Sequence, residues 1–257
     1  MLRLPAGAGA ETLRARVLAR VTTTSIAARR RATVVYRNDR EQTVRRVLAV
    51  ARRGGGRVQV VRRPLAARVE APALRQSLPN TCESAALSIL LATRGVRAAQ
   101  DGLQADLPRS GPLDPTGTGD DRTWGDPELG YVGRGAGGGV AGGFGVYQRP
   151  VIELAARRGV RLDDLSGADA STVYRRLLSG RAVMAWVGLS DGPYGRWRSP
   201  QGRPVEVNFG EHTVVLAGVQ RDGAIRVSNP LQGTIERWSR ERFETMWTRL
   251  DRRAVGA

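Results

Sequence analysis

The chain has 257 residues and 41% of them are hydrophobic, enough for one sizeable core and a small second unit. Its only cysteine is Cys82, which excludes an intramolecular disulfide, and no apolar run reaches the roughly 18–20 residues of a membrane-spanning helix. The net charge is +17, and all 41 basic residues are arginine. Residues 1–75 hold 18 of these arginines against four acidic residues. A basic N-terminal third therefore precedes a nearly neutral remainder.

Two units are expected in the basic third of the chain. Residues 1–31 are rich in alanine and arginine, and we expect a solvated helix or a disordered tail. The alternative is a basic amphipathic segment that contacts nucleic acid or an anionic lipid surface. Residues 32–70 are expected to form a small strand–helix–strand unit. Its helix is predicted because apolar residues between 44 and 51 have helical spacing, with a capping residue at Asn38 and a stop at Gly54.

Residues 71–257 are expected to form the main domain. Its predicted elements, in chain order, are a buried helix over 82–93, a Gly- and Pro-rich stretch with little regular structure from 101 to 147, helices over 150–158 and 169–179, strands over 182–189, 213–219, 224–228 and 234–238, and a final helix capped by Ser239. A helix therefore comes first and an antiparallel sheet follows. This order predicts an α+β fold and argues against a doubly wound parallel sheet.

Cys82 is a candidate nucleophile because either Asn80 or Thr81 can cap a helix that begins beside it. The first turn of a helix has unpaired N–H groups and the positive end of the helix dipole, which favour the thiolate. The thiolate is the form of cysteine that attacks well. A lone cysteine in a helix is otherwise most often a small buried hydrophobic residue. The polar residues before Cys82 favour the catalytic interpretation.

His212, the only histidine, precedes a strongly apolar predicted strand. That strand and the next form a hairpin around Asp222 and Gly223, a strong turn signal. If residues 220–223 are the loop, His212 and Asn229 are diagonal neighbours on one face, whereas an odd-numbered loop would separate them. The Asn229 carboxamide would then accept the imidazole N–H and fix its tautomer. The alternative is a strand-end histidine that bonds a backbone carbonyl.

Gln76 lies shortly before Cys82, across a turn that contains proline. Hydrolysis by a cysteine nucleophile needs donors that stabilise the oxyanion. The side-chain amide of Gln76 could supply one of them beside the backbone N–H of Cys82.

No cofactor and no metal are expected. Residues 133–138 fit a GxGxxG pattern but lack the surrounding strand and helix of a dinucleotide-binding unit. The acidic residues between 114 and 128 do not have the spacing of an EF-hand loop. One cysteine and one histidine do not make a zinc site.

Several segments, in their order along the chain, resemble the C39-like family of papain-like cysteine peptidases. They are Gln76 with Pro79–Glu83, Trp124–Gly133, Gly145–Tyr147, Glu211–Val215 and Asn229–Gly233. The resemblance implies a papain-like fold, with a nucleophile at the N-terminus of a buried helix packed on an antiparallel sheet that carries the histidine and the asparagine. It implies Cys82 as nucleophile, His212 as general base and then acid, Gln76 as oxyanion donor and Asn229 as the orienting residue. The family usually has aspartate at the position of Asn229.

These observations predict a cysteine peptidase or amidase that hydrolyses a peptide or isopeptide bond of a peptide or protein substrate through a thioester acyl-enzyme. The chain contains no Walker motif, so a stand-alone peptidase domain without an exporter ATPase is expected. One alternative is an acyltransferase or deamidase on the same fold. Another is a catalytically silent module whose Arg-rich residues 1–70 contact nucleic acid or lipid.

The expected location follows from the beginning of the sequence. The first residues lack the apolar segment of a secretory signal, which predicts a cytoplasmic protein. The alternative is secretion, as for many stand-alone members of the family, if translation begins elsewhere.

Overall fold

The computed structural model describes residues 20–26, 29–37, 43–52, 58–60, 66–137 and 142–257. Its main body is an antiparallel sheet with the strand order β14-β13-β12-β9-β15-β8, in which β5 also pairs with β12. The strands are β5 Ala67–Arg68, β8 Asp163–Asp164, β9 Val183–Gly188, β12 Glu211–Val219, β13 Ile225–Asn229, β14 Thr234–Trp238 and β15 Ala254–Gly256. The mixture of helices with an antiparallel sheet confirms the α+β class.

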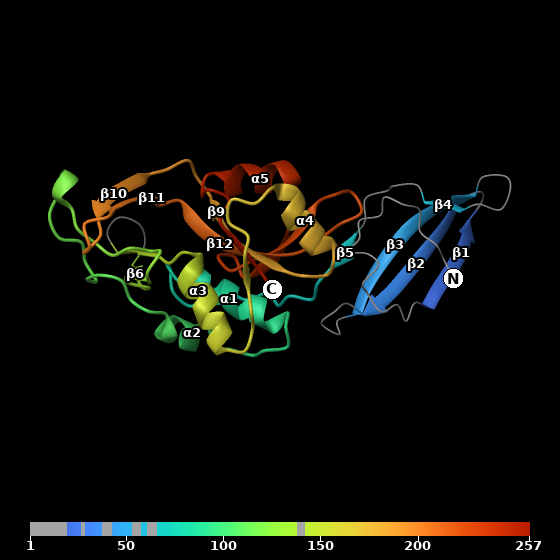
Figure 1. Cartoon of the computed structure of the whole chain (residues 1–257), viewed down its shortest axis with the longest axis horizontal. Helices are drawn as coiled ribbons and strands as arrows, with labels where there is room; N and C mark the ends of the chain where they lie inside the picture. Colours follow the sequence, from blue (N-terminus) through green and yellow to red (C-terminus); the bar gives the residue numbers. More distant parts are fainter. Residues whose placement is uncertain (1–19, 27–28, 38–42, 53–57, 61–65, 138–141) are drawn as a thin grey trace.

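Helices cover both faces of this sheet (Figure 1). On one face lie α1 Cys82–Ala92, α2 Gln100–Asp106 and α3 Gln148–Arg157, and on the other lie α4 Ala170–Leu178 and α5 Arg240–Thr248. Strand β12 contributes to both cores, because side chains alternate between the faces of a strand. Val215 and Ala217 pack in the cluster that contains α1, while Val214 and Leu216 pack in the cluster that contains α4 and α5.

A loop region extends from the end of α2 to α3 and includes short regular pieces. They are the 3-10 helix η2 Gly119–Asp121 and the paired strands β6 Val132–Gly133 and β7 Gly143–Gly145. A hairpin of β10 Tyr194–Arg198 and β11 Pro204–Asn208 packs against this region. An aromatic cluster joins the two parts, with ring centroids of Trp124 and Trp197 at 5.3 Å and those of Phe144 and Phe209 at 5.9 Å.

The N-terminal unit differs from the prediction. Its described residues form a four-stranded antiparallel sheet of β1 Arg20–Ile26, β2 Arg29–Arg37, β3 Thr43–Arg52 and β4 Val58–Val60. The helix predicted between residues 44 and 51 is therefore wrong, because this segment is β3. Its valines favour a strand, and the apolar residues at 44, 48 and 50 fit a period of two as well as a helical one. Of the predicted tail 1–31, residues 20–26 and 29–31 are strand, and residues 1–19 lie outside the described part.

The main-domain helices and strands that were predicted agree with the structure to within two residues, and Ser239 caps α5 by accepting a hydrogen bond from the backbone N–H of Arg242 at 3.1 Å. Helix α2 and strands β6, β7, β8, β10, β11 and β15 were not predicted, and α2, β6 and β7 overlap the stretch from 101 to 147 that was expected to have little regular structure. No helix in the described part of the chain has the length and apolar character needed to cross a membrane.

Truncating a side chain at the contact between α1 and the sheet should destabilise the domain. Leu90 is fully buried in the α1 cluster, so Leu90→Ala should lower the free energy of unfolding by about 2–5 kcal/mol through lost apolar contact and a residual cavity. Urea denaturation measures this loss. Leu113→Ala is the matched control, because Leu113 is 41% exposed and its truncation should change the stability by less than about 0.5 kcal/mol. Equal losses in the two variants would contradict this assignment of the core.

Candidate active site

Cys82 is the first residue of α1 and follows the N-cap residue Thr81. The Thr81 hydroxyl makes no capping bond to the helix. It accepts a hydrogen bond from the backbone N–H of Leu78 at 3.2 Å and donates to the Leu78 carbonyl at 3.1 Å. The Thr81 side chain therefore closes the turn from Leu78 to Thr81, and this turn leads directly into α1 at Cys82.

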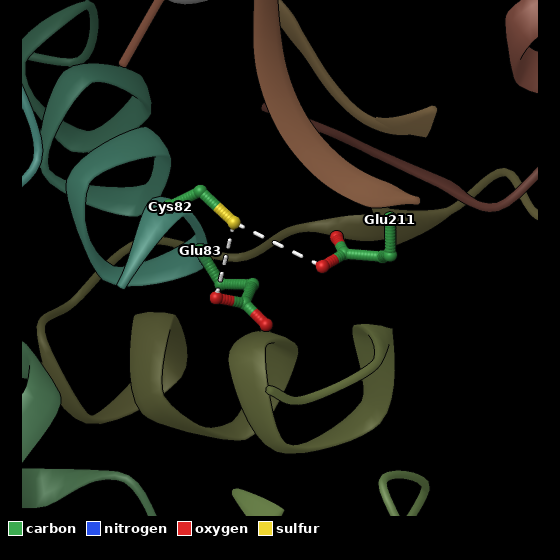
Figure 2. Close-up of side chains that lie close together, drawn as sticks. All are labelled: Cys82, Glu83 and Glu211. Carbon is green, nitrogen blue, oxygen red and sulfur yellow. Dashed lines mark hydrogen bonds between the residues drawn. The ribbon is translucent and has the colours of Figure 1, made fainter. Parts of the chain in front are cut away.

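The Cys82 thiol lies between two carboxyl groups (Figure 2). Its Sγ donates to Oε2 of Glu83 at 3.4 Å and lies 3.9 Å from Oε2 of Glu211, and the residue is only 4% exposed. Burial, then Glu211 and Glu83, raise the pKa of the thiol well above its ordinary value, and the backbone N–H of Thr213 lowers it. The stabilised thiolate expected at a helix N-terminus is therefore not the resting form, because burial and two acidic neighbours outweigh the helix.

Glu83 links the start of α1 to the segment after β7. Its Oε1 accepts a hydrogen bond from the backbone N–H of Val146 at 2.7 Å, and burial raises its pKa to about 7. Gly145 has φ of +118°, and a Cβ at this position would collide with Oε1 of Glu83. The carboxyl group thus occupies space that only glycine leaves open.

Glu211 is the first residue of β12 and is partly buried. Burial, then the charge of Glu83, raise its pKa well above the usual range, and the hydroxyl of Thr213 donates to its Oε1 at 2.9 Å. One ligand atom each from Cys82, Glu83 and Glu211 lie within 4.8 Å of one another. By donor type the three residues could hold a cation, and the hydrogen bonds among them account for the same proximity without one.

His212 and Asn229 are hydrogen-bonded, with 2.8 Å between Nε2 and Oδ1. The strand register explains this contact: Val215 pairs with Ser228 and Leu216 with Val227, which puts residues 212 and 229 on the same face. The expected four-residue loop over 220–223 is wrong, because Val219 pairs with Ile225 and an odd number of residues lies between them; the register shift between Leu216 and Val219 restores the shared face. A bulge lies between this register and the turn. Both side chains are buried, at 3% and 5% exposure.

The hydrogen bonds of the Asn229 side chain determine the tautomer of His212. Oδ1 of Asn229 also accepts from the backbone N–H of Leu231 at 3.1 Å, and Nδ2 donates to Oε1 of Glu236 at 2.7 Å. The amide oxygen therefore faces the imidazole, so Nε2 must carry the proton and Nδ1 is the basic nitrogen. Burial lowers the pKa of His212 to about 4, although Asn229 and Glu236 act in the opposite direction.

Gln76 lies close to this site, because its backbone N–H donates to the Pro230 carbonyl at 3.0 Å, one residue after Asn229. Its side-chain Nε2 donates to the carbonyls of Leu78 and Pro79 at 3.0 and 2.8 Å. Both amide protons are therefore engaged, and Oε1 is buried without a hydrogen bond to any described residue. An oxyanion role for Gln76 requires its amide to release one carbonyl.

The expected residues thus form two groups at one end of β12. Cys82 contacts Glu83 and Glu211, and His212 contacts Asn229. No hydrogen bond joins the described side chains of Cys82 and His212. Sγ lies against Glu211 and the N–H of Thr213 on the α1 side of β12, whereas His212 pairs with Val187 and has the parity of Val214 and Leu216, which face α4 and α5. The structure therefore places Cys82 and His212 on opposite faces of the strand. Sequence reasoning missed the roles of both glutamates, although each is adjacent in sequence to Cys82 or His212.

Residues 68–255 match the Peptidase C39 like family. The chain belongs to this family. The match confirms the resemblance inferred from the motifs, and at the family level it indicates a cysteine-peptidase type of function. A crystal structure from Bacillus anthracis, described as a C39-like peptidase, resembles this C39-like chain with a TM-score of 0.60 and 23% sequence identity, over 73% of this chain and 94% of that one. This likeness shows a shared fold. No curated protein matches the chain.

Removing the acid beside the thiol should make the cysteine easier to ionise. In Glu211→Gln the negative charge that opposes the thiolate is lost, so the pKa of Cys82 should fall, and each unit of that fall raises the thiolate fraction about tenfold. The rate of iodoacetamide alkylation between pH 7 and 10 measures this as a midpoint at lower pH. Glu241→Gln, an exposed change on α5, should leave the profile unchanged. An unchanged or higher midpoint in Glu211→Gln would be inconsistent with this electrostatic effect.

Acid should destabilise the protein through His212. Its folded-state pKa of about 4 lies below the unfolded value near 6.5, so on acidification the unfolded chain binds the proton first. Relative to His212→Gln, the wild type should therefore lose roughly 3 kcal/mol of stability between pH 7 and 4. Urea unfolding of both proteins at several pH values measures the difference, in which the carboxyl groups common to both largely cancel. A difference independent of pH would mean that the imidazole is not buried in its neutral form.

Proposed function

We propose that the protein is a cysteine peptidase or amidase that hydrolyses a peptide or isopeptide bond through a thioester acyl-enzyme. The observation that carries this proposal is the position of the only thiol. Sγ of Cys82 lies at a helix N-terminus. It contacts Glu211 and the backbone N–H of Thr213, the residues directly before and after His212 in β12. Membership of the C39-like family supports the same reading.

In the proposed first step, Cys82 transfers its proton to Nδ1 of His212 and Sγ attacks the carbonyl carbon of the scissile bond. The carbonyl oxygen becomes an oxyanion, which the backbone N–H of Cys82 and Nε2 of Gln76 stabilise. The imidazolium then donates its proton to the leaving nitrogen, the carbon–nitrogen bond breaks and a thioester remains. In the second half, His212 takes a proton from water, the hydroxide attacks the thioester, and the thiol leaves with the proton.

This mechanism requires two rearrangements of the resting site. The start of β12 must rearrange so that the His212 imidazole and the Cys82 thiol lie on the same face, and Gln76 must release one of its two carbonyls. Catalytic hydrogen bonds are often incomplete before the substrate arrives, which accounts for the change at Gln76, whereas the change at β12 is a larger rearrangement of the backbone. The described arrangement is therefore an inactive form of the proposed site, in both the placement of His212 and the protonation of Cys82.

A candidate substrate-contacting segment lies beside the turn before Cys82. The backbone N–H of Asn80 donates to the Gly135 carbonyl at 3.0 Å, and its side-chain amide donates to the hydroxyl of Tyr131 at 3.1 Å. Leu78, in the same turn, is 42% exposed and lies close to Gly135. We assign this apolar edge to contact with substrate residues near the scissile bond.

Digestion of a peptide library by wild type and Cys82→Ala tests the proposed reaction. The wild type should release new amino termini, and Cys82→Ala should lower the rate by at least about 10³-fold because the nucleophile is absent. Mass spectrometry of the products, with and without an added amine, distinguishes hydrolysis from acyl transfer and from deamidation of glutamine. Circular dichroism of both proteins controls for folding. Equal digestion by the two proteins, or products that arise only with the amine, would reject the proposed hydrolysis.

A further inference from the structure

Glu236 extends the hydrogen-bonded pair of His212 and Asn229 onto a third strand. Its Oε1 accepts from Nδ2 of Asn229 at 2.7 Å, and its Oε2 accepts from the indole Nε1 of Trp238 at 2.6 Å. The register between β13 and β14 produces this contact. Asn229 pairs with Thr234 and Val227 pairs with Glu236, so Glu236 is the diagonal neighbour of Asn229.

The chemistry of the four groups gives each hydrogen bond one direction. A carboxylate only accepts and an indole N–H only donates. Trp238 therefore holds one oxygen of Glu236, and the other oxygen can receive only the NH₂ end of the Asn229 amide. The amide oxygen must then point away, toward Nε2 of His212 and the backbone N–H of Leu231.

Without Glu236 the Asn229 amide keeps one constraint, the backbone N–H of Leu231 on Oδ1, and an amide has two orientations of similar shape. If the Asn229 amide turned over, its NH₂ would face Nε2 of His212. Nε2 would then have to accept, and the proton would move to Nδ1. An imidazole with its proton on Nδ1 cannot take a proton from a thiol at that nitrogen. The orientation of one amide thus decides which nitrogen of His212 is basic.

We propose that Glu236 is a positioning residue for the proposed peptidase reaction: it orients the Asn229 amide, and through it holds His212 in the tautomer with the proton on Nε2. Its carboxylate also supplies the negative charge that the neutral Asn229 does not bring to the imidazole. Trp238, which is 1% exposed, fixes the carboxylate in turn, and the guanidinium of Arg242 lies 4.6 Å from the Trp238 ring. The inference rests on the proposed function, and its structural part can be tested without it.

The only histidine of the chain makes the test direct. In full-length protein labelled with ¹⁵N-histidine, the two imidazole nitrogen shifts near pH 7 report which nitrogen carries the proton, with a single set of signals to assign. The wild type should show the proton on Nε2. In Glu236→Gln, the indole N–H of Trp238 donates to the oxygen of the new glutamine amide, so the glutamine NH₂ faces Asn229. This arrangement favours the inverted orientation of the Asn229 amide. The expected result is a shift of the proton toward Nδ1.

A second variant separates orientation from charge. In the double variant Glu236→Gln/Trp238→Phe, the indole no longer demands an oxygen, so the glutamine oxygen can turn to Asn229. The Nε2–H tautomer should return, although the charge is still absent. Glu241→Gln, an exposed glutamate on α5, is the matched control and should leave the imidazole signals unchanged.

Kinetics give the second readout. Glu236→Gln should lower kcat by about 10–100-fold with KM changed less than about twofold, and the double variant should recover part of that loss. Retention of the Nε2–H tautomer in Glu236→Gln would overturn the proposal whatever the rate does. A double variant that stays in the inverted tautomer would overturn it as well. If the wild type shows no hydrolysis that depends on Cys82, the proposed function fails while the tautomer measurement still decides the role of Glu236.

Discussion

Strand β12 is the element on which both cores and the candidate site depend. Its pairing with β9 and β13 decides which side chains face α1 and which face α4 and α5, and a shift by one residue would exchange them. The apolar residues from 214 to 217 fix this register because both faces are buried. Glu211, His212 and Thr213 precede them in the same strand. Hydrophobic packing therefore determines where these polar groups lie.

Burial acts in opposite senses on the acids and the base of the site, and in both cases it favours the neutral form. It raises the pKa values of Cys82, Glu83 and Glu211 and lowers the pKa of His212. Neutral, hydrogen-bonded groups cost less to bury than separated charges. These polar groups can therefore lie between two cores.

The sequence was informative wherever a local rule determines position. The polar residues before Cys82 predicted the start of α1, although Thr81 makes no capping hydrogen bond. The shared face of His212 and Asn229 was predicted from an even-numbered loop, whereas the structure has an odd-numbered loop and a bulge that restores the parity. Glu236 was not identified because its contact depends on the register of a third strand. The contact between Cys82 and Glu211 depends on how a helix packs on a strand 129 residues away. The predicted helix near residue 48 failed because short apolar runs fit both periods, and pairing with β2 decides between them.

Cys82 is the only thiol of the chain, and its protonated, buried state bears on its chemical durability. Peroxides and disulfides react with thiolates much faster than with thiols. A sulfur that is 4% exposed and hydrogen-bonded to carboxyl groups therefore resists oxidation to the sulfinic and sulfonic acids, which are not readily reversed. The buried, protonated arrangement therefore protects the thiol for as long as its surroundings stay as described.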